Sequence, residues 1–214
     1  MKDTLQFNLL SIVYYIFVGL LSLFVAENIA DIEWNKFTLY DIIHEHTKPE
    51  PHPDIPTYIV YFFILYIVFR WMFIRPELVG LFFLLVAMLF TLRIFTFTST
   101  LTPPTELKEN VWRDKHCKRD LMGHLGFSFS KGNNNCIGNM FSGHASHTIM
   151  ALMIILYFSK YMYEKVFLTL LALINLVLII TSRLHYTSDV IVGSSLASLL
   201  FVAYVSYNRD VWKK

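Results

Sequence analysis

Long apolar blocks constrain this sequence more than any other feature. A bilayer core about 30 Å thick is crossed by a helix of about 20 apolar residues. Six blocks approach that length, which predicts an all-α membrane protein with about six transmembrane helices. These blocks are Asn8–Ala26, Tyr58–Ile74, Leu78–Phe97, Ser142–Ser159, Val166–Thr181 and Val190–Tyr207. We expect residues 1–214 to form a single transmembrane domain.

Composition supports the same fold class. Hydrophobic residues make up 55% of the chain, above the roughly 45–50% of soluble domains. A net charge of +2 gives no indication of a nucleic-acid partner. Two cysteines are too few for a disulfide framework, although Cys117 and Cys136 share a loop and pair only if that loop is luminal. The last block is rich in Gly, Ala and Ser, so we expect it to pack closely inside the bundle.

The first block has two interpretations. Its length of about 19 residues favours a membrane span. Lys2, with Ala26 or Ala30 near a cleavage point, also fits a signal peptide.

Orientation follows from basic residues near the short loops. Arg70, Arg75, Lys160, Lys165 and Arg209 fall on one side, which the positive-inside rule makes cytosolic. The long loops at 28–56 and 98–141 then face the lumen or exterior, although basic residues in the second loop argue against this orientation. We expect a multi-pass protein of the endoplasmic reticulum, Golgi or plasma membrane.

Four ionisable residues are expected at one membrane face. His144 begins the fourth span, His185 and Asp189 begin the sixth, and Arg93 lies near the end of the third. With six spans, these positions share one side of the bilayer. Ionisable groups at this depth are costly and mark functional sites by default.

These residue types suit phosphate chemistry. His185 and Asp189 are four residues apart, so on a helix the carboxylate orients the imidazole and leaves its other nitrogen as base or nucleophile. His144 is a candidate general acid. The Ser142–Gly143 helix start and Arg93 are candidate phosphate-binding groups.

Each feature also has a structural interpretation. A lone histidine at the membrane edge is commonly a packing residue, and an H-x-x-x-D pair arises by chance. Ser142 can serve only as a helix cap, and Arg93 can extend to the interface. The combination at two helix starts favours a site.

Four segments resemble the sphingomyelin synthase branch of the type 2 phosphatidic acid phosphatase (PAP2) superfamily. Residues 51–55 are similar to its P-P-L-P-D element and residues 93–103 to R-x-x-T-M-x-V-T-x-L-P. Residues 136–144, CIGNMFSGH, are similar to C-G-D-x-L-F-S-G-H, and residues 185–190, HYTSDV, to H-Y-T-x-D-V. The resemblance covers about residues 50–207. The chain departs from it at Gly138, where the family has Asp, and at Ala145, where it has Thr.

The resemblance implies a metal-free head-group transfer without cofactor. His185 would attack phosphorus and form a phosphohistidine, Asp189 would stabilise its imidazolium, and His144 would exchange protons with the lipid oxygens. Substrate contacts would come from Arg93, Ser142, Gly143 and Tyr186. The implied partners are a glycerophospholipid donor and a ceramide or diacylglycerol acceptor; Asp120 or Glu106 are candidates for the negative charge missing at Gly138. The sequence leaves homo-oligomerisation open.

Three alternatives stay open. The same triad with water as acceptor would make a lipid phosphate phosphatase, although Arg183 stands closer to His185 than the arginine of that branch does. A non-catalytic lipid-binding protein with this fold is the second. The third concerns the proline-rich stretch containing His44, Glu45, His46 and His52, which has metal-ligand residue types but reads as an extended loop.

Overall fold

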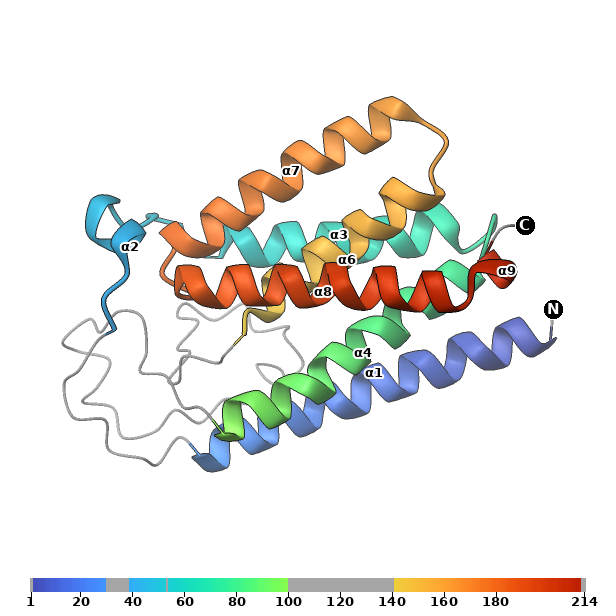
Figure 1. Ribbon diagram of the computed structural model, residues 1–214, viewed down its shortest axis with the longest axis horizontal. Helices are drawn as coiled ribbons and strands as arrows, with labels where there is room; N and C mark the ends of the chain where they lie inside the picture. The colour runs from blue at the N-terminus through green and yellow to red at the C-terminus, as the bar shows by residue number, and fades with distance from the viewer. Residues whose placement is uncertain (1, 30–38, 53, 100–140, 213–214) are drawn as a thin grey trace.

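The computed structural model describes residues 2–29, 39–52, 54–99 and 141–212, and every regular element in these ranges is a helix (Figure 1). Six helices are long: α1 (Lys2–Ile29), α3 (Ile55–Trp71), α4 (Glu77–Ser99), α6 (Gly143–Phe158), α7 (Met162–Thr181) and α8 (Thr187–Tyr207). Two are short: α2 (Ile42–His46) and α9 (Arg209–Trp212).

Each predicted block overlaps one long helix. Four of these helices, α1, α4, α7 and α8, are long and apolar enough to cross a membrane, while α3 and α6 are apolar but shorter. The predicted all-α membrane fold is thus confirmed. The largest shift is at the first span, whose helix begins at Lys2 rather than Asn8, and the helix of the sixth span begins at Thr187 rather than Val190.

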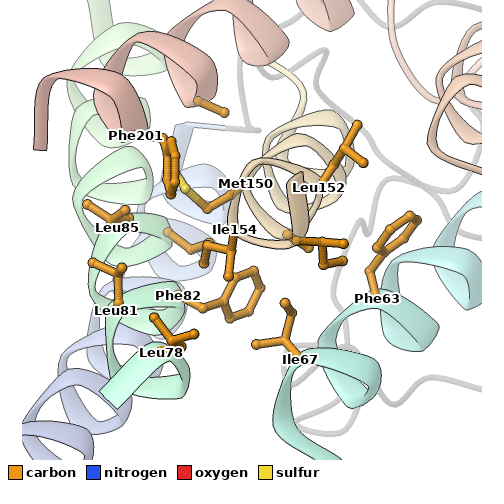
Figure 2. Packing of buried hydrophobic residues seen from close by; sticks show 14 of the residues in the cluster. Phe63, Ile67, Leu78, Leu81, Phe82, Leu85, Met150, Leu152, Ile154 and Phe201 are labelled. Atoms are coloured by element: carbon orange, nitrogen blue, oxygen red, sulfur yellow. The ribbon is translucent and has the colours of Figure 1, made fainter. Parts of the chain in front are cut away.

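Helix α6 is the centre of the bundle. It packs against α3, α4, α7 and α8 (Figure 1), and most of its residues are buried. Figure 2 shows Met150 and Ile154 of α6 among Phe82 of α4, Phe201 of α8 and Ile67 of α3. These apolar contacts hold together the helices that carry the candidate site residues.

Helix α1 packs along α4. The Asn8 side-chain amide donates to the Pro76 carbonyl at 2.9 Å, and the Tyr14 and Thr91 hydroxyls lie 2.7 Å apart. These polar contacts between apolar helices favour the interpretation of the first block as a membrane span.

Helix α8 places its small residues against α6. A Cβ added to Gly193 would lie 2.7 Å from the Ser142 carbonyl oxygen, so this approach requires glycine. The expected close packing of the last span is therefore present, with Gly193 and Ala197 both buried. The outer faces of α7 and α8 expose large apolar residues such as Val177 and Leu199, as expected for contact with lipid.

The end of the bundle that holds Arg70 contains a buried acid. Glu164 of α7 accepts hydrogen bonds from the Tyr66 and Ser159 hydroxyls and pairs with Arg70 at 3.2 Å. This network ties α3, the end of α6 and the start of α7 together. The starts of α6 and α8 lie at the opposite end (Figure 1).

Candidate active site

The starts of α6 and α8 are joined through their main chains. The Ser142 amide donates to the Asp189 carbonyl at 3.0 Å. Next to this bond, the Ser146 hydroxyl donates to the Ser142 carbonyl at 2.8 Å and lies 3.4 Å from the Gly193 carbonyl. The two predicted histidine-bearing segments are thereby fixed side by side.

His144 and His185 face each other across this junction. Their ring centroids are 5.9 Å apart, and the rings are inclined by 62°. His185 is 3% exposed, whereas His144 is only partly buried. A separation of this size brings two imidazoles from distant parts of the chain within reach of one bound group.

Asp189 lies behind His185. Its Oδ2 is 3.7 Å from His185 Nδ1, which is longer than a hydrogen bond, so the contact is electrostatic. The same oxygen accepts a hydrogen bond from the Tyr186 amide at 3.2 Å, which fixes the carboxylate at the start of α8. Among the described residues, His185 Nδ1 has no hydrogen-bond partner. The expected His–Asp pair therefore exists, with His185 in the turn that precedes the helix rather than on the helix itself.

The environment of His185 favours its neutral form. Burial lowers the pKa of the imidazole, and the positive charge of Arg93 acts in the same direction, while Asp189 opposes both. A buried neutral imidazole keeps the lone pair that a nucleophile or base requires.

Arg93 reaches the start of α6 from the end of α4. Its Nε donates to the Phe141 carbonyl at 3.0 Å, and its Cζ lies 5.6 Å from the Phe90 ring centroid. A Cβ on Gly143 would lie 3.3 Å from Phe90 and 3.4 Å from Arg93 Nη1, so Gly143 leaves room for both side chains. The structure thus brings Arg93, Gly143, His144 and His185 together.

Residues 135–206 match the family model described as PAP2 superfamily, C-terminal. The match supports the PAP2 superfamily. The matched residues include the two histidines and the aspartate, and a match of this kind suggests lipid chemistry of the phosphatase or phosphotransferase type. The curated proteins contain no match to this chain.

The polar atoms of Ser142 bond within the junction of α6 and α8. Its Oγ accepts from the Ala145 amide at 3.2 Å as an N-cap, while its own amide serves Asp189. The Ser142 hydroxyl therefore acts as a helix cap, as its structural interpretation predicted. The next amide of the first turn is that of Gly143.

Tyr186 contacts the α2 region. Its ring stacks on His44 of α2 at 5.7 Å with an angle of 26°, and its hydroxyl accepts from the Leu39 amide at 3.3 Å. Burial raises the pKa of this phenol, so it stays neutral. In this structure Tyr186 contacts the segment between α1 and α3, and its contact with substrate stays a prediction.

Two residues near the start of α6 were not predicted from the sequence. Thr57 of α3 places its Oγ1 3.0 Å from His144 Nε2. His147 is buried in the core, where its Nδ1 donates to the Gly143 carbonyl at 2.8 Å and its Nε2 accepts from the Tyr15 hydroxyl at 2.9 Å. The sequence could have indicated Thr57, because it is a hydroxyl residue in the first turn of α3. That turn lies at the same end of the bundle as the site.

The histidines at 44 and 46, which have metal-ligand residue types, make contacts within the protein instead. His46 Nδ1 donates to the Ile42 carbonyl of its own helix at 2.8 Å, and His44 packs on Tyr186. Within the described ranges, no three His, Cys, Asp or Glu side chains are grouped in a way that could hold a metal ion. Cys117, Cys136, Glu106, Asp120 and Gly138 lie outside the described residues.

Proposed function

We propose that this protein transfers a phospho-head group, phosphocholine or phosphoethanolamine, from a glycerophospholipid to ceramide or diacylglycerol. The observation that carries the proposal is the 5.9 Å separation of the His144 and His185 rings, with the Asp189 carboxylate behind one of them. Two imidazoles so placed can act on opposite bonds of one phosphorus atom.

In the first half-reaction His185 is the nucleophile. Its Nε2 lone pair attacks phosphorus, a P–N bond forms, and the P–O bond to diacylglycerol breaks. His144 gives its proton to the departing oxygen, and Asp189 stabilises the positive charge on the phosphorylated imidazole. Arg93 and the Gly143 amide neutralise the phosphate oxygens.

The second half-reaction reverses these roles. His144 removes the proton from the acceptor hydroxyl, the oxygen attacks phosphorus, and the P–N bond breaks to restore His185. No cofactor takes part in this scheme. With water as acceptor the same steps make a lipid phosphate phosphatase, which the PAP2 match supports equally.

The active site of this enzyme faces the lumen or exterior of the endoplasmic reticulum, Golgi or plasma membrane. Arg70 lies in the last turn of α3, Lys160 between α6 and α7, and Arg209 just after α8, whereas His144 lies at the start of α6 and His185 just before α8. By the positive-inside rule the end with these basic residues is cytosolic.

Lipid product analysis tests the proposal. Membranes of a host lacking such enzymes, expressing the protein and supplied with head-group-labelled phosphatidylcholine or phosphatidylethanolamine, should yield labelled product when ceramide or diacylglycerol is added. Phosphate release from phosphatidic acid without head-group transfer would select the phosphatase. Absence of every product, or a cellular lipid phenotype that survives His144→Ala and His185→Ala, would leave a non-catalytic lipid-binding role.

A further inference from the structure

His185 lies in the turn that connects α7 to α8. Helix α7 ends at Thr181 and α8 begins at Thr187, so His185 lies between the two helices. Main-chain bonds within a helix therefore do not fix its position. Its neighbours at 183 and 187 instead bond to residues 39–52, which we call the α2 segment.

Asp41 holds the residue that follows the turn. Its Oδ2 accepts from the Thr187 amide at 2.6 Å, and its Oδ1 accepts from the Thr187 hydroxyl at 2.9 Å. Oδ1 also accepts from the Ile43 and His44 amides at 3.0 and 3.2 Å. One carboxylate thus caps α2 and the start of α8 together.

The same carboxylate stays charged. Burial acts to raise the pKa of Asp41, but the hydrogen bonds from Thr187 and His44 outweigh burial and lower it. An ionised carboxylate accepts these bonds with both oxygens, which an amide side chain cannot do.

Arg183 joins the first part of the turn to the α2 segment. Its Nη2 donates to the His44 and Thr47 carbonyls at 2.6 and 2.7 Å, and its Nη1 donates to the Thr47 hydroxyl at 3.2 Å. Arg183 also has a φ of 57°, a left-handed conformation that residues other than glycine seldom adopt. Such a conformation persists where surrounding contacts impose it.

A third set of contacts lies between these two. The Tyr186 ring stacks on His44, and the Glu50 amide donates to the Thr181 carbonyl at 2.9 Å. The α2 segment therefore contacts the turn before, beside and after His185. These contacts come from a part of the chain outside the PAP2 match.

We infer that Asp41 and Arg183 are positioning residues, which fix the turn 182–186 so that His185 faces His144 with Asp189 behind it. The inference rests on the proposed function for its catalytic meaning. Neither residue needs to touch the substrate, because both act through the main chain on either side of His185. Arg183, the arginine nearest the histidine in sequence, serves the turn rather than the phosphate.

Diethyl pyrocarbonate labelling of individual histidines tests this placement without relying on turnover. In nanodiscs, Asp41→Asn should raise the labelling rate of His185 several-fold, because the loosened turn exposes the ring. Exposed His46 should keep its rate, and buried His147, held by Tyr15, should stay unlabelled while the fold is intact. Glu45→Gln, at an exposed acid of the same short helix, is the matched control.

Thr187 provides a second pair of variants if Asp41→Asn unfolds the protein. Thr187→Val removes the hydroxyl donor to Asp41 and should raise His185 labelling, whereas Thr187→Ser keeps that donor and should match the parent protein. In the transfer assay, the loosened variants should lose about tenfold to a hundredfold in kcat, the effect of a misplaced reacting group, with little change in KM.

The outcomes separate the two claims. An unchanged His185 labelling rate in both Asp41→Asn and Thr187→Val would overturn the positioning role, as would an equal increase in Glu45→Gln. A parent protein without transfer or hydrolysis of any lipid would overturn the proposed function, while the labelling rates would still decide whether the α2 segment fixes the turn.

Discussion

Thr57 and His144 come from different helices, and the threonine hydroxyl oxygen lies 3.0 Å from Nε2 of the histidine. The hydroxyl sets the orientation of the ring from the first turn of α3. Because Thr57 lies 87 residues from His144 in sequence, the orientation of the proposed general acid depends on the packing of α3 against α6.

Removing that hydroxyl should slow transfer. Thr57→Val keeps the shape of the side chain but leaves the His144 ring without this partner, so we expect kcat to fall about tenfold to a hundredfold. Thr57→Ser keeps a hydroxyl and should recover most of the rate. Equal rates for Val and Ser, measured with labelled phosphatidylcholine in vesicles, would show that the bond has no role in orientation.

The covalent step predicts a phosphorylated protein. With head-group-labelled donor and no acceptor, the parent protein should carry an acid-labile label, and His185→Ala should carry none and lose at least about a thousandfold in kcat. His46→Ala, at an exposed histidine of α2, should label and turn over as the parent does. Persistence of the acid-labile label in His185→Ala would rule out this nucleophile.

The acid limb of the pH–rate profile should lie below the usual histidine value. The lowered pKa of His185 keeps its imidazole neutral at a pH where an ordinary histidine, with a pKa of about 6.5, is largely protonated. Arg93→Gln removes a charge that lowers this pKa, so its acid limb should move to higher pH. A limb that stays in place would show that the profile reports another group.

The same pKa shift has a consequence for stability. Below a pH of about 6.5 the unfolded chain binds a proton at His185 that the folded protein does not. The contribution of this residue is therefore complete above that value and is lost as pH falls. Thermal unfolding should show a steeper loss of stability on acidification in the parent than in a well-folded His185→Gln variant.

Gly193 and Gly19 form a matched pair for packing. Alanine at 193 would place Cβ 2.7 Å from the Ser142 carbonyl oxygen, whereas at 19 no atom lies within 4 Å. Gly193→Ala should cost about 1–3 kcal/mol, as overpacking does, and should also reduce transfer by separating the histidines. Gly19→Ala should be neutral or gain up to about 1 kcal/mol from helix propensity. Thermal unfolding in nanodiscs compares them directly.

The helices were predictable because each apolar block is long enough to indicate a helix that crosses the membrane. The meeting of His144 with His185 followed from counting spans, since alternate spans run in opposite directions. The exact start of α8 did not follow, because the turn at 182–186 depends on contacts with the α2 segment.

Thr57, Asp41 and the role of Arg183 were not predictable. Each acts through one or a few hydrogen bonds to a residue far along the chain, and such bonds leave no periodic signal in the sequence. The stacking of Tyr186 on His44 was not predictable either, and its contact with substrate stays a prediction. The identity of the head group stays a prediction, because the residues 135–140 that bear on it lie outside the described part of the chain.

The main-chain bond from Ser142 to Asp189 links one residue to both imidazoles. The carboxylate of Asp189 lies behind one imidazole, while its carbonyl anchors the helix that bears the other. The gap between the rings is consequently set by backbone atoms at the bundle end and not by the side chains that meet lipid. Those outward residues can vary with the thickness and composition of the surrounding bilayer without altering the spacing of the two rings.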